Sequence, residues 1–274
     1  MPNIPWRRYQ AFLQAHPYRE TNGIAYLEAG QGDPPLVFLH GLLETADAWW
    51  QQFEDFSHAL RVVAPTLPAF DTLEDLAERV LGFLDALGLD HVVLVGNSLG
   101  GYLAQYLAAR APERLRAAVF SNTAPPLLAF RLRVALRVAR YRRMPEERLK
   151  ASLRRFVEKR VYLFEGASPL PRDYLLQAVE RISKATFLQR YQALTTPFRV
   201  PRLEIPHMVI YSTEDQLIPR GIAREMLRVY PEAEHHHMIG HFSYLSDPRK
   251  YDEHLGRFLN RYILFPFPSP PSST

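Results

Sequence analysis

Gly96-Asn97-Ser98-Leu99-Gly100 is the most informative stretch of this sequence, because it sets a serine between two glycines where a strand pattern meets a helix pattern. The apolar run Val92–Val95 before it has the length of a buried strand, and Tyr102–Leu107 after it follows helical spacing. A G-x-S-x-G turn in this setting holds its serine in a strained conformation that side chains at the flanking positions would not permit. The following helix also directs its positive N-terminus at Ser98, which favours an oxyanion there. We therefore predict that Ser98 is a nucleophile; the alternative is a Gly-Ser turn without chemistry.

Outward from this turn, short apolar runs alternate with helical patterns between Gly23 and Val119, which indicates βαβ units and a mostly parallel sheet. The run Leu36–Leu39 is apolar throughout, as expected for a strand between two helix layers. Thr72 and Asp75 predict the capped start of a helix that stops at Gly88. Further strands are expected at 61–64, 91–95, 117–121, 207–211 and 234–239, and further helices at 99–110, 219–229 and 248–262.

The alternation stops over residues 124–206, which are rich in Arg, Leu and aromatic residues at helical spacing. We interpret this stretch as a helical cap inserted into one α/β core that consists of residues 1–123 and 207–264. Residues 265–274 contain four prolines and three serines, a composition typical of a disordered tail.

A serine nucleophile needs a base to take its proton and a carboxylate to orient that base. In chains with this turn the acid and then the histidine follow the serine in sequence. His241 lies on a loop after the last expected strand, whereas His235–His237 lie within it. Asp215 and Glu214 both follow the preceding strand, and we favour Asp215 because its position before the next helix directs it inward. The predicted triad is therefore Ser98, Asp215 and His241.

Acyl transfer also needs two backbone N–H donors for the oxyanion of the tetrahedral intermediate. We expect these from Leu99, directly after the nucleophile, and from Leu42, on the loop after the strand Leu36–Leu39. His40 on that loop is interpreted as a brace for the loop. A hydrophobic substrate is expected to contact the apolar residues Leu43, Trp49, Tyr162, Phe187 and Phe242.

The composition excludes several chemistries. The 274 residues include no cysteine, so a thiol nucleophile, a disulfide and a cysteine-bound metal are ruled out. Adjacent histidines on one strand, at 235–237, do not easily converge on one ion, so we predict no metal site, and the triad requires no cofactor. No apolar run is long enough to span a membrane and no secretory signal is expected, so we predict a cytoplasmic protein.

The net charge of +4 conceals a strongly basic segment, because residues 130–160 hold twelve Lys/Arg against three Asp/Glu. Arg133, Arg137 and Arg140 are spaced for one helix face. This face is either an attractor for an anionic substrate, acidic lipids or a partner, or the solvated side of a cap helix. Nucleic acid is not an expected partner, because no known binding motif accompanies the arginines.

His40-Gly41, the Gly96–Gly100 turn, Asp215 and Gly240-His241 occur in the order and context of the α/β-hydrolase superfamily, which the chain resembles from about residue 23 to 262. The resemblance implies an eight-stranded, mostly parallel sheet flanked by helices, a helical cap over the nucleophile, and hydrolysis of esters or similar acyl compounds. Serine at the turn argues against the dehalogenase and epoxide-hydrolase members, which carry Asp there.

A narrower resemblance to the maspardin branch rests on the stretches 44–50, 96–105, 229–231 and 242–245. Maspardin lacks a histidine at the position of His241 and is regarded as a binding protein. The histidine here favours an enzyme, and a non-catalytic binding protein is the alternative. Asn97 also occurs beside the serine of carbon–carbon hydrolases, which usually have Trp where Phe242 stands, and cofactor-free perhydrolases share the triad. The main hypothesis is a serine hydrolase of the carboxylesterase type.

Overall fold

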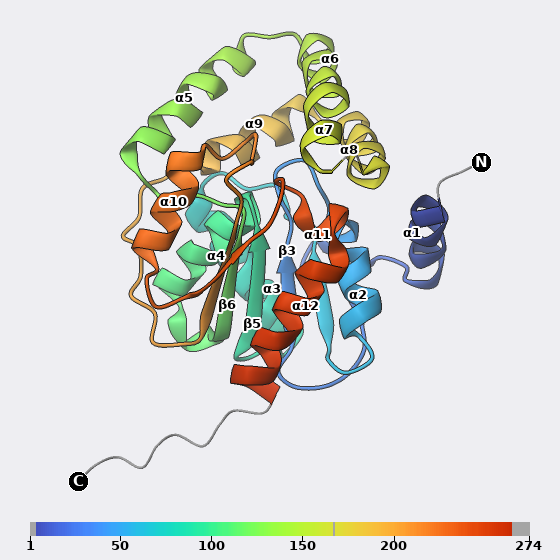
Figure 1. Ribbon diagram of the computed structural model, residues 1–274, viewed down its shortest axis with the longest axis vertical. Helices are drawn as coiled ribbons and strands as arrows, with labels where there is room; N and C mark the ends of the chain where they lie inside the picture. The colour runs from blue at the N-terminus through green and yellow to red at the C-terminus, as the bar shows by residue number, and fades with distance from the viewer. Residues whose placement is uncertain (1–3, 167, 265–274) are drawn as a thin grey trace.

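The computed structural model describes residues 4–166 and 168–264, and the predicted tail at 265–274 lies outside the described residues. The described chain forms an eight-stranded, mostly parallel sheet with helices on its faces and a group of helices above one edge (Figure 1). This architecture confirms the α/β fold predicted from the sequence.

The strands of the sheet lie in the order β1-β2-β4-β3-β5-β6-β7-β8. The pairs β1–β2 and β2–β4 are antiparallel, and the other pairs are parallel. Because parallel strands end at the same edge, the loops after β3, β5, β6, β7 and β8 gather there. The bounds are β1 (Arg19–Thr21), β2 (Ile24–Ala29), β3 (Leu36–Leu39), β4 (Val62–Pro65), β5 (Val92–Asn97), β6 (Leu115–Ser121), β7 (His207–Tyr211) and β8 (Glu234–His237).

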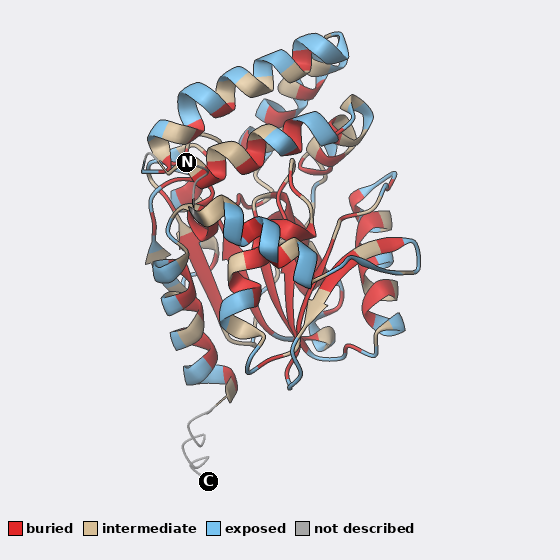
Figure 2. Cartoon of the chain, turned by 90° about the vertical axis from the view of Figure 1, so that its right-hand side faces the viewer, coloured by how far each residue is buried: buried red, intermediate tan, exposed pale blue. Residues whose placement is uncertain are grey.

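Helices cover both faces of the sheet, and a buried apolar cluster fills each interface (Figure 2). Residues of α3, α4 and α10 belong to one cluster, and residues of α1, α2, α11 and α12 belong to the other. β3 and β4 are buried along their whole length, which explains why their sequences are apolar without alternation. The bounds are α1 (Ile4–Ala15), η1 (Ala46–Trp49), α2 (Trp50–Phe56), α3 (Leu73–Ala86), α4 (Leu99–Arg110), η2 (Pro112–Arg114), α10 (Arg220–Val229), α11 (Ser243–Ser246), α12 (Pro248–Leu259) and η4 (Asn260–Leu264).

The helix α3 begins and ends where its sequence predicts. The hydroxyl of Thr72 accepts the N–H of Asp75 at 3.1 Å, a cap that stabilises a helix by about 1 kcal/mol. The chain leaves the helix at Gly88, whose φ of 62° suits glycine. β8, in contrast, ends two residues before its predicted end, since the chain turns away from the sheet toward Gly240, where φ is 81°.

Between β6 and β7 the chain forms a cap of helices above the carboxyl edge of the parallel strands (Figure 1). The described part of residues 124–206 contains no strand, and its division from the core as a separate domain remains a prediction. None of the helices in the described chain is long and apolar enough to cross a membrane. The cap helices are α5 (Leu128–Arg142), α6 (Glu146–Phe156), η3 (Val157–Val161), α7 (Tyr162–Phe164), α8 (Pro169–Arg181) and α9 (Lys184–Ala193).

Candidate active site

Ser98 lies at the sharp turn between β5 and α4, with φ 55° and ψ −114°. A residue other than glycine in such a conformation carries backbone strain of roughly 1–3 kcal/mol, so its neighbours must hold it there. The N–H of Ser98 donates to the carbonyl of Ser121 at 2.9 Å. The Ser98 carbonyl accepts the hydroxyl of Thr123 at 2.7 Å and the N–H of Tyr102 at 2.9 Å. These bonds fix the backbone of Ser98, a half-buried residue at the carboxyl edge of the sheet.

Two glycines allow this turn to close against the rest of the core. A Cβ on Gly96 would lie 2.2 Å from the carbonyl oxygen of Gly100. A Cβ on Gly100 would lie 2.1 Å from the carbonyl oxygen of Leu39. Both clashes involve backbone atoms, which cannot move aside as a flexible side chain can. The two glycines of the motif are therefore packing requirements of this turn.

Asp215 and His241 form a buried pair at the same edge. Nδ1 of His241 lies 2.6 Å from Oδ2 of Asp215, and both side chains are almost inaccessible. The other carboxylate oxygen accepts the N–H groups of Leu217 at 2.7 Å and Ile218 at 2.9 Å, so the carboxylate is held on both sides. The competing carboxylate, Glu214, is 49% exposed. The structure thus brings Asp215, and not Glu214, against the imidazole.

The surroundings of His241 act on its basicity in opposite directions. Burial lowers the pKa of the imidazole, but the charge and hydrogen bond of Asp215 raise it, assisted by Glu44 and Glu165. The net direction is upward from the ordinary value of 6.5. A raised pKa makes the neutral imidazole a stronger base, but a larger fraction of it is protonated near neutral pH.

Asn122, directly after β6, connects the loops that carry the acid and the histidine. Its side-chain amide donates to the carbonyl of Gly240 at 2.6 Å and lies 3.5 Å from Oδ2 of Asp215. Its φ of 42° directs the chain sharply away from the strand. The sequence motifs do not identify Asn122, although its position after a strand of the same sheet is a signal that could have found it.

Glu165 reaches from the end of α7 in the cap to the loop that carries His241. Its Oε1 accepts the N–H groups of His241 at 2.5 Å and Phe242 at 3.1 Å, and its Oε2 accepts the hydroxyl of Ser246 at 2.9 Å. Burial raises the pKa of Glu165 to about 7, against the lowering effect of these donors. No sequence motif marks Glu165, since the contact joins residues 76 positions apart.

The loop after β3 is braced by His40. Nε2 of His40 accepts the N–H of Leu67 at 2.8 Å, so Nδ1 carries the proton and donates to the carbonyl of Gly41 at 2.7 Å. Burial, together with the positive charge of Arg190, lowers the pKa of His40 well below its ordinary value. A neutral ring with both nitrogens occupied is a structural brace, as the sequence suggests.

Arg190 of α9 ties the cap to this same loop. Its guanidinium donates to the carbonyl oxygens of Leu42 at 3.2 Å, Glu44 at 2.9 Å and Leu67 at 2.9 Å. The carboxylate of Glu44 accepts the N–H of Gly41, and burial raises the pKa of Glu44. The backbone around Leu42 is therefore held by Arg190 of the cap and by the carboxylate of Glu44.

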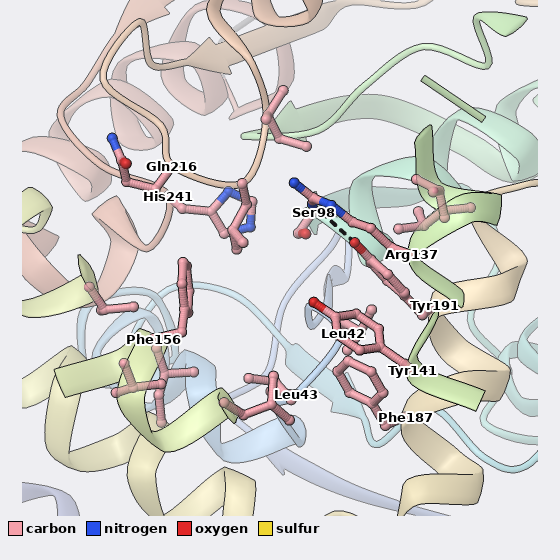
Figure 3. A pocket seen from close by; sticks show the side chains of 18 of the residues that line it. Leu42, Leu43, Ser98, Arg137, Tyr141, Phe156, Phe187, Tyr191, Gln216 and His241 are labelled. Atoms are coloured by element: carbon pink, nitrogen blue, oxygen red, sulfur yellow. Dashed lines mark hydrogen bonds between the residues drawn. The ribbon is translucent and has the colours of Figure 1, made fainter. Parts of the chain in front are cut away.

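A pocket of about 330 Å³ lies between the sheet edge and the cap (Figure 3). Ser98 and His241 both border this active-site pocket, as does Leu42, while Leu99 opens α4 immediately after Ser98. Asp215 stands behind His241. Three of the residues predicted to contact substrate also line the pocket, namely Leu43, Phe187 and Phe242.

Trp49 and Tyr162 do not line this pocket, which corrects the expectation for both residues. Trp49 is fully buried, with ring centroids 4.7 Å from Phe38 and 4.2 Å from Tyr244, so it belongs to the core beneath the loop. The ring of Tyr162 is covered by the guanidinium of Arg172 at 5.1 Å. An aromatic residue near a predicted site has the same sequence signature whether it packs inward or faces substrate.

The helix α5 turns its arginines toward the pocket and its leucines away from it. Arg133, Arg137 and Arg140 all border the pocket. Leu132 and Leu136 on the other side are 56% and 75% exposed. The arginine face is therefore part of the pocket wall, whereas Leu132 and Leu136 do not border the pocket.

The adjacent histidines at 235–237 do not approach the active-site pocket. His236 stacks on His254 with ring centroids 4.1 Å apart, away from Ser98 and His241. Within residues 4–166 and 168–264, no group of three or more His, Asp or Glu side chains is arranged to hold a metal ion.

The sheet order and the serine turn at the end of β5 define the class of protein. Residues 34–248 match the family model described as "alpha/beta hydrolase fold", and this match covers most of the chain. The chain belongs to the alpha/beta hydrolase fold family. The narrower resemblance to the maspardin branch is not supported by the comparisons with known proteins, among which are a carbon–carbon hydrolase, an enol-lactonase and an esterase.

A curated relative from Paraburkholderia phymatum is named 2-hydroxy-6-oxononadienedioate/2-hydroxy-6-oxononatrienedioate hydrolase. It is 27% identical over 266 residues, which cover 87% of this chain and 91% of the relative. Among solved structures, the enol-lactonase from Burkholderia xenovorans has a TM-score of 0.74 at 21% identity, covering 89% of this chain and 100% of its own. A thermophilic esterase from Thermogutta terrifontis has a TM-score of 0.69 at 19% identity, covering 89% and 96%. At these identities the two structures show a shared fold.

Proposed function

We propose that this chain is a serine hydrolase that cleaves carboxylic esters through an acyl-enzyme. Ser98 is the nucleophile, His241 the general base and acid, and Asp215 the carboxylate that orients the imidazole. The observation that carries the proposal is that the strained Ser98 turn and the buried Asp215–His241 pair meet at one pocket. Membership of the alpha/beta hydrolase fold family supports it.

In the first half-reaction, the Ser98 hydroxyl oxygen attacks the ester carbonyl carbon while Nε2 of His241 takes the hydroxyl proton. Asp215 holds the proton on Nδ1, so that Nε2 is the free base, and stabilises the imidazolium that forms. The N–H groups of Leu42 and Leu99 stabilise the oxyanion. The intermediate then expels the alcohol, whose oxygen receives the proton from Nε2, and the acyl group stays on Ser98.

In the second half-reaction, water attacks the acyl carbon and gives a proton to Nε2 of His241. The same two N–H groups stabilise the second oxyanion. Collapse of this intermediate releases the carboxylic acid and returns the proton to the oxygen of Ser98. The enzyme is unchanged, and one water has been added across the ester bond.

The pocket favours a small and largely apolar acyl compound. Its volume of about 330 Å³ is close to the lower end of small-molecule sites. Tyr141, Phe187 and Tyr191 form an aromatic wall, with ring centroids 5.6–5.9 Å apart. Leu43 and Phe242 add further apolar surface. We expect esters of short or medium acyl chains to fit best.

Fluorophosphonate labelling of the full chain tests the proposal, because the reagent modifies only an activated serine. We expect one label on Ser98, and none in Ser98→Ala. We also expect hydrolysis of p-nitrophenyl hexanoate by the parent chain and loss of turnover in Ser98→Ala. A folded chain that takes no label and hydrolyses no ester would instead be a non-catalytic binding protein. Turnover that persists in Ser98→Ala would rule out this nucleophile.

Hydrolysis of a carbon–carbon bond is a second candidate, favoured by the similarity to the Paraburkholderia hydrolase over most of both chains. Asn97 before the nucleophile agrees with it, whereas Phe242 after the histidine replaces the Trp usual in such enzymes. The two candidates separate when 2-hydroxy-6-oxononadienedioate and p-nitrophenyl hexanoate are compared by kcat/KM. A higher value for the ester supports the first candidate, and a higher value for the dienedioate supports the second.

A further inference from the structure

Three arginines of α5 border the active-site pocket from the cap. Arg133, Arg137 and Arg140 are separated by four and three positions, which sets them on one helix face. The helix is pinned by its buried residues Phe130 and Val134. The charged face therefore has a fixed direction, toward the pocket that holds Ser98.

These arginines have no acidic partner in the described chain. Within residues 4–166 and 168–264, no ion pair of 4.0 Å or less joins a carboxylate to Arg133, Arg137 or Arg140. The acidic residue that borders the pocket, Glu44, is buried and already accepts the N–H of Gly41, and burial raises its pKa. The pocket wall consequently carries excess positive charge.

Among the three arginines, Arg137 is the one whose side chain is held in place by a hydrogen bond within the described chain. It is half-buried, and its Nη1 donates to the hydroxyl of Tyr191 at 3.1 Å (Figure 3). Tyr191 is itself held in a stack on Phe187, with ring centroids 5.6 Å apart. A partly desolvated guanidinium without a counter-ion is costly, and its remaining N–H groups match the two oxygens of a carboxylate.

We propose that Arg137 binds a carboxylate at the end of the substrate remote from the scissile ester, so that the preferred substrates are monoesters of dicarboxylic acids. Arg133 and Arg140 increase the positive potential that draws such an anion into the pocket. The aromatic wall contacts the carbon chain of the substrate between its ester and its carboxylate. This inference rests on the proposed function, since it assigns the substrate class of the same site.

The test compares two substrates of equal chain length, p-nitrophenyl hydrogen adipate and p-nitrophenyl hexanoate, which differ by a carboxylate in place of a methyl group. We expect a higher kcat/KM for the adipate monoester, with an advantage that shrinks as salt is added. Arg137→Gln should lower the adipate-to-hexanoate ratio of kcat/KM by roughly 10-fold to 100-fold. The hexanoate value should fall less than the adipate value, because hexanoate has no carboxylate for Arg137 to bind.

Arg143→Gln is the matched control, because Arg143 is exposed at the end of the same helix and does not border the pocket. It removes the same charge and should leave the ratio unchanged. Arg137→Lys retains the charge without the planar fork and should give an intermediate ratio. A parent ratio near one, or a ratio that falls equally in Arg137→Gln and Arg143→Gln, would overturn the assignment.

A binding measurement separates this inference from the proposed hydrolysis. Calorimetric titration of Ser98→Ala with monoethyl adipate and with ethyl hexanoate reports recognition without turnover. Tighter binding of monoethyl adipate that is lost on adding Arg137→Gln supports the inference even if the parent chain hydrolyses no ester. Equal binding of both compounds, in a chain that labels at Ser98, overturns the inference and leaves the proposed function intact.

Discussion

The carboxylate of Glu165, in the cap, accepts the backbone N–H of His241, in the core, at 2.5 Å. The same oxygen accepts the N–H of Phe242 at 3.1 Å, so one cap residue holds two consecutive peptides of the histidine loop. Gly240 leaves room for this carboxylate, because a Cβ there would lie 2.2 Å from Oε2. The position of the imidazole is thus linked to the position of the cap.

Removing the Glu165 carboxylate should therefore reduce turnover more than substrate affinity. We expect Glu165→Ala to lower kcat for p-nitrophenyl hexanoate by roughly 10-fold to 100-fold, because a small displacement of a catalytic group is costly. KM should change little, since Glu165 does not border the pocket. Glu165→Gln should retain most of the activity, because its amide oxygen can accept the same two N–H groups.

Glu158→Ala is the control for this prediction. Glu158 lies in η3, is exposed, and precedes the same stretch of the cap. Its replacement should leave kcat unchanged. A positioning role for Glu165 would be contradicted if Glu165→Gln lost as much activity as Glu165→Ala, or if KM rose while kcat stayed constant.

On the acidic side of the pH profile, activity should be lost at a higher pH than it would be with a histidine of ordinary pKa. In the proposed mechanism His241 must be neutral to take the proton of Ser98. Burial lowers the pKa of His241, but Asp215, together with Glu44 and Glu165, raises it above 6.5. As the pH falls through this raised pKa, the imidazole is protonated and the base is lost. The acidic limb of the kcat/KM profile should therefore lie above pH 6.5.

Asp215→Asn should move that limb to lower pH, because the amide has no negative charge to offset the lowering effect of burial on the pKa of His241. Its amide would also favour the tautomer with the proton on Nε2, so kcat should fall by roughly four orders of magnitude. Glu214→Gln, at the exposed neighbouring carboxylate, should alter neither quantity. An acidic limb that stays in place in Asp215→Asn would mean that another group controls the protonation of the base.

The three residues of the proposed triad could be selected from the sequence because of a simple topological fact. Ser98, Asp215 and His241 each follow an apolar strand, and the ends of parallel strands meet at one edge of the sheet. The serine is further marked by glycines that the turn requires. Local sequence and sheet topology together were therefore sufficient to select three residues that the structure brings to one place.

The contacts made by the cap could not be predicted in the same way. Glu165 and Arg190 reach the core through side chains whose targets are backbone groups, and any sequence offers backbone N–H and carbonyl groups. Which ones are contacted depends on how the cap helices pack over the sheet. The misplacement of Trp49 has a related cause, since the direction of an aromatic side chain on an irregular loop has no periodic signature.

Gly100→Ala should destabilise the chain and remove fluorophosphonate labelling. The added methyl group would lie 2.1 Å from the carbonyl oxygen of Leu39 and 2.8 Å from that of His40. Relief requires a backbone shift at the Ser98 turn, at a cost of roughly 1–3 kcal/mol in the free energy of unfolding. Urea denaturation and the rate of labelling at Ser98 measure the two effects.

Gly82→Ala makes the same chemical change in a different environment. Gly82 lies within α3, and a Cβ there would meet no atom within 4 Å. Alanine should raise the free energy of unfolding by about 0.5–1 kcal/mol, because glycine loses more backbone freedom in a helix. If both variants destabilised the chain equally, the close approach at Gly100 would not be the reason that glycine is needed there.

Substitution of Trp49 should lower the free energy of unfolding without changing substrate preference, whereas substitution of Leu43 should change substrate preference. Trp49→Phe leaves a void between Phe38 and Tyr244 in the core, so the free energy of unfolding should fall by roughly 1–3 kcal/mol. The ratio of kcat/KM for p-nitrophenyl hexanoate over p-nitrophenyl acetate should not change, because Trp49 does not border the pocket. Leu43 lines the pocket and is only partly buried, so Leu43→Ala enlarges the pocket and should shift that ratio toward the longer acyl chain. The accompanying loss in the free energy of unfolding should be smaller than for Trp49→Phe. A changed ratio in Trp49→Phe, with none in Leu43→Ala, would return Trp49 to the substrate site and remove Leu43 from it.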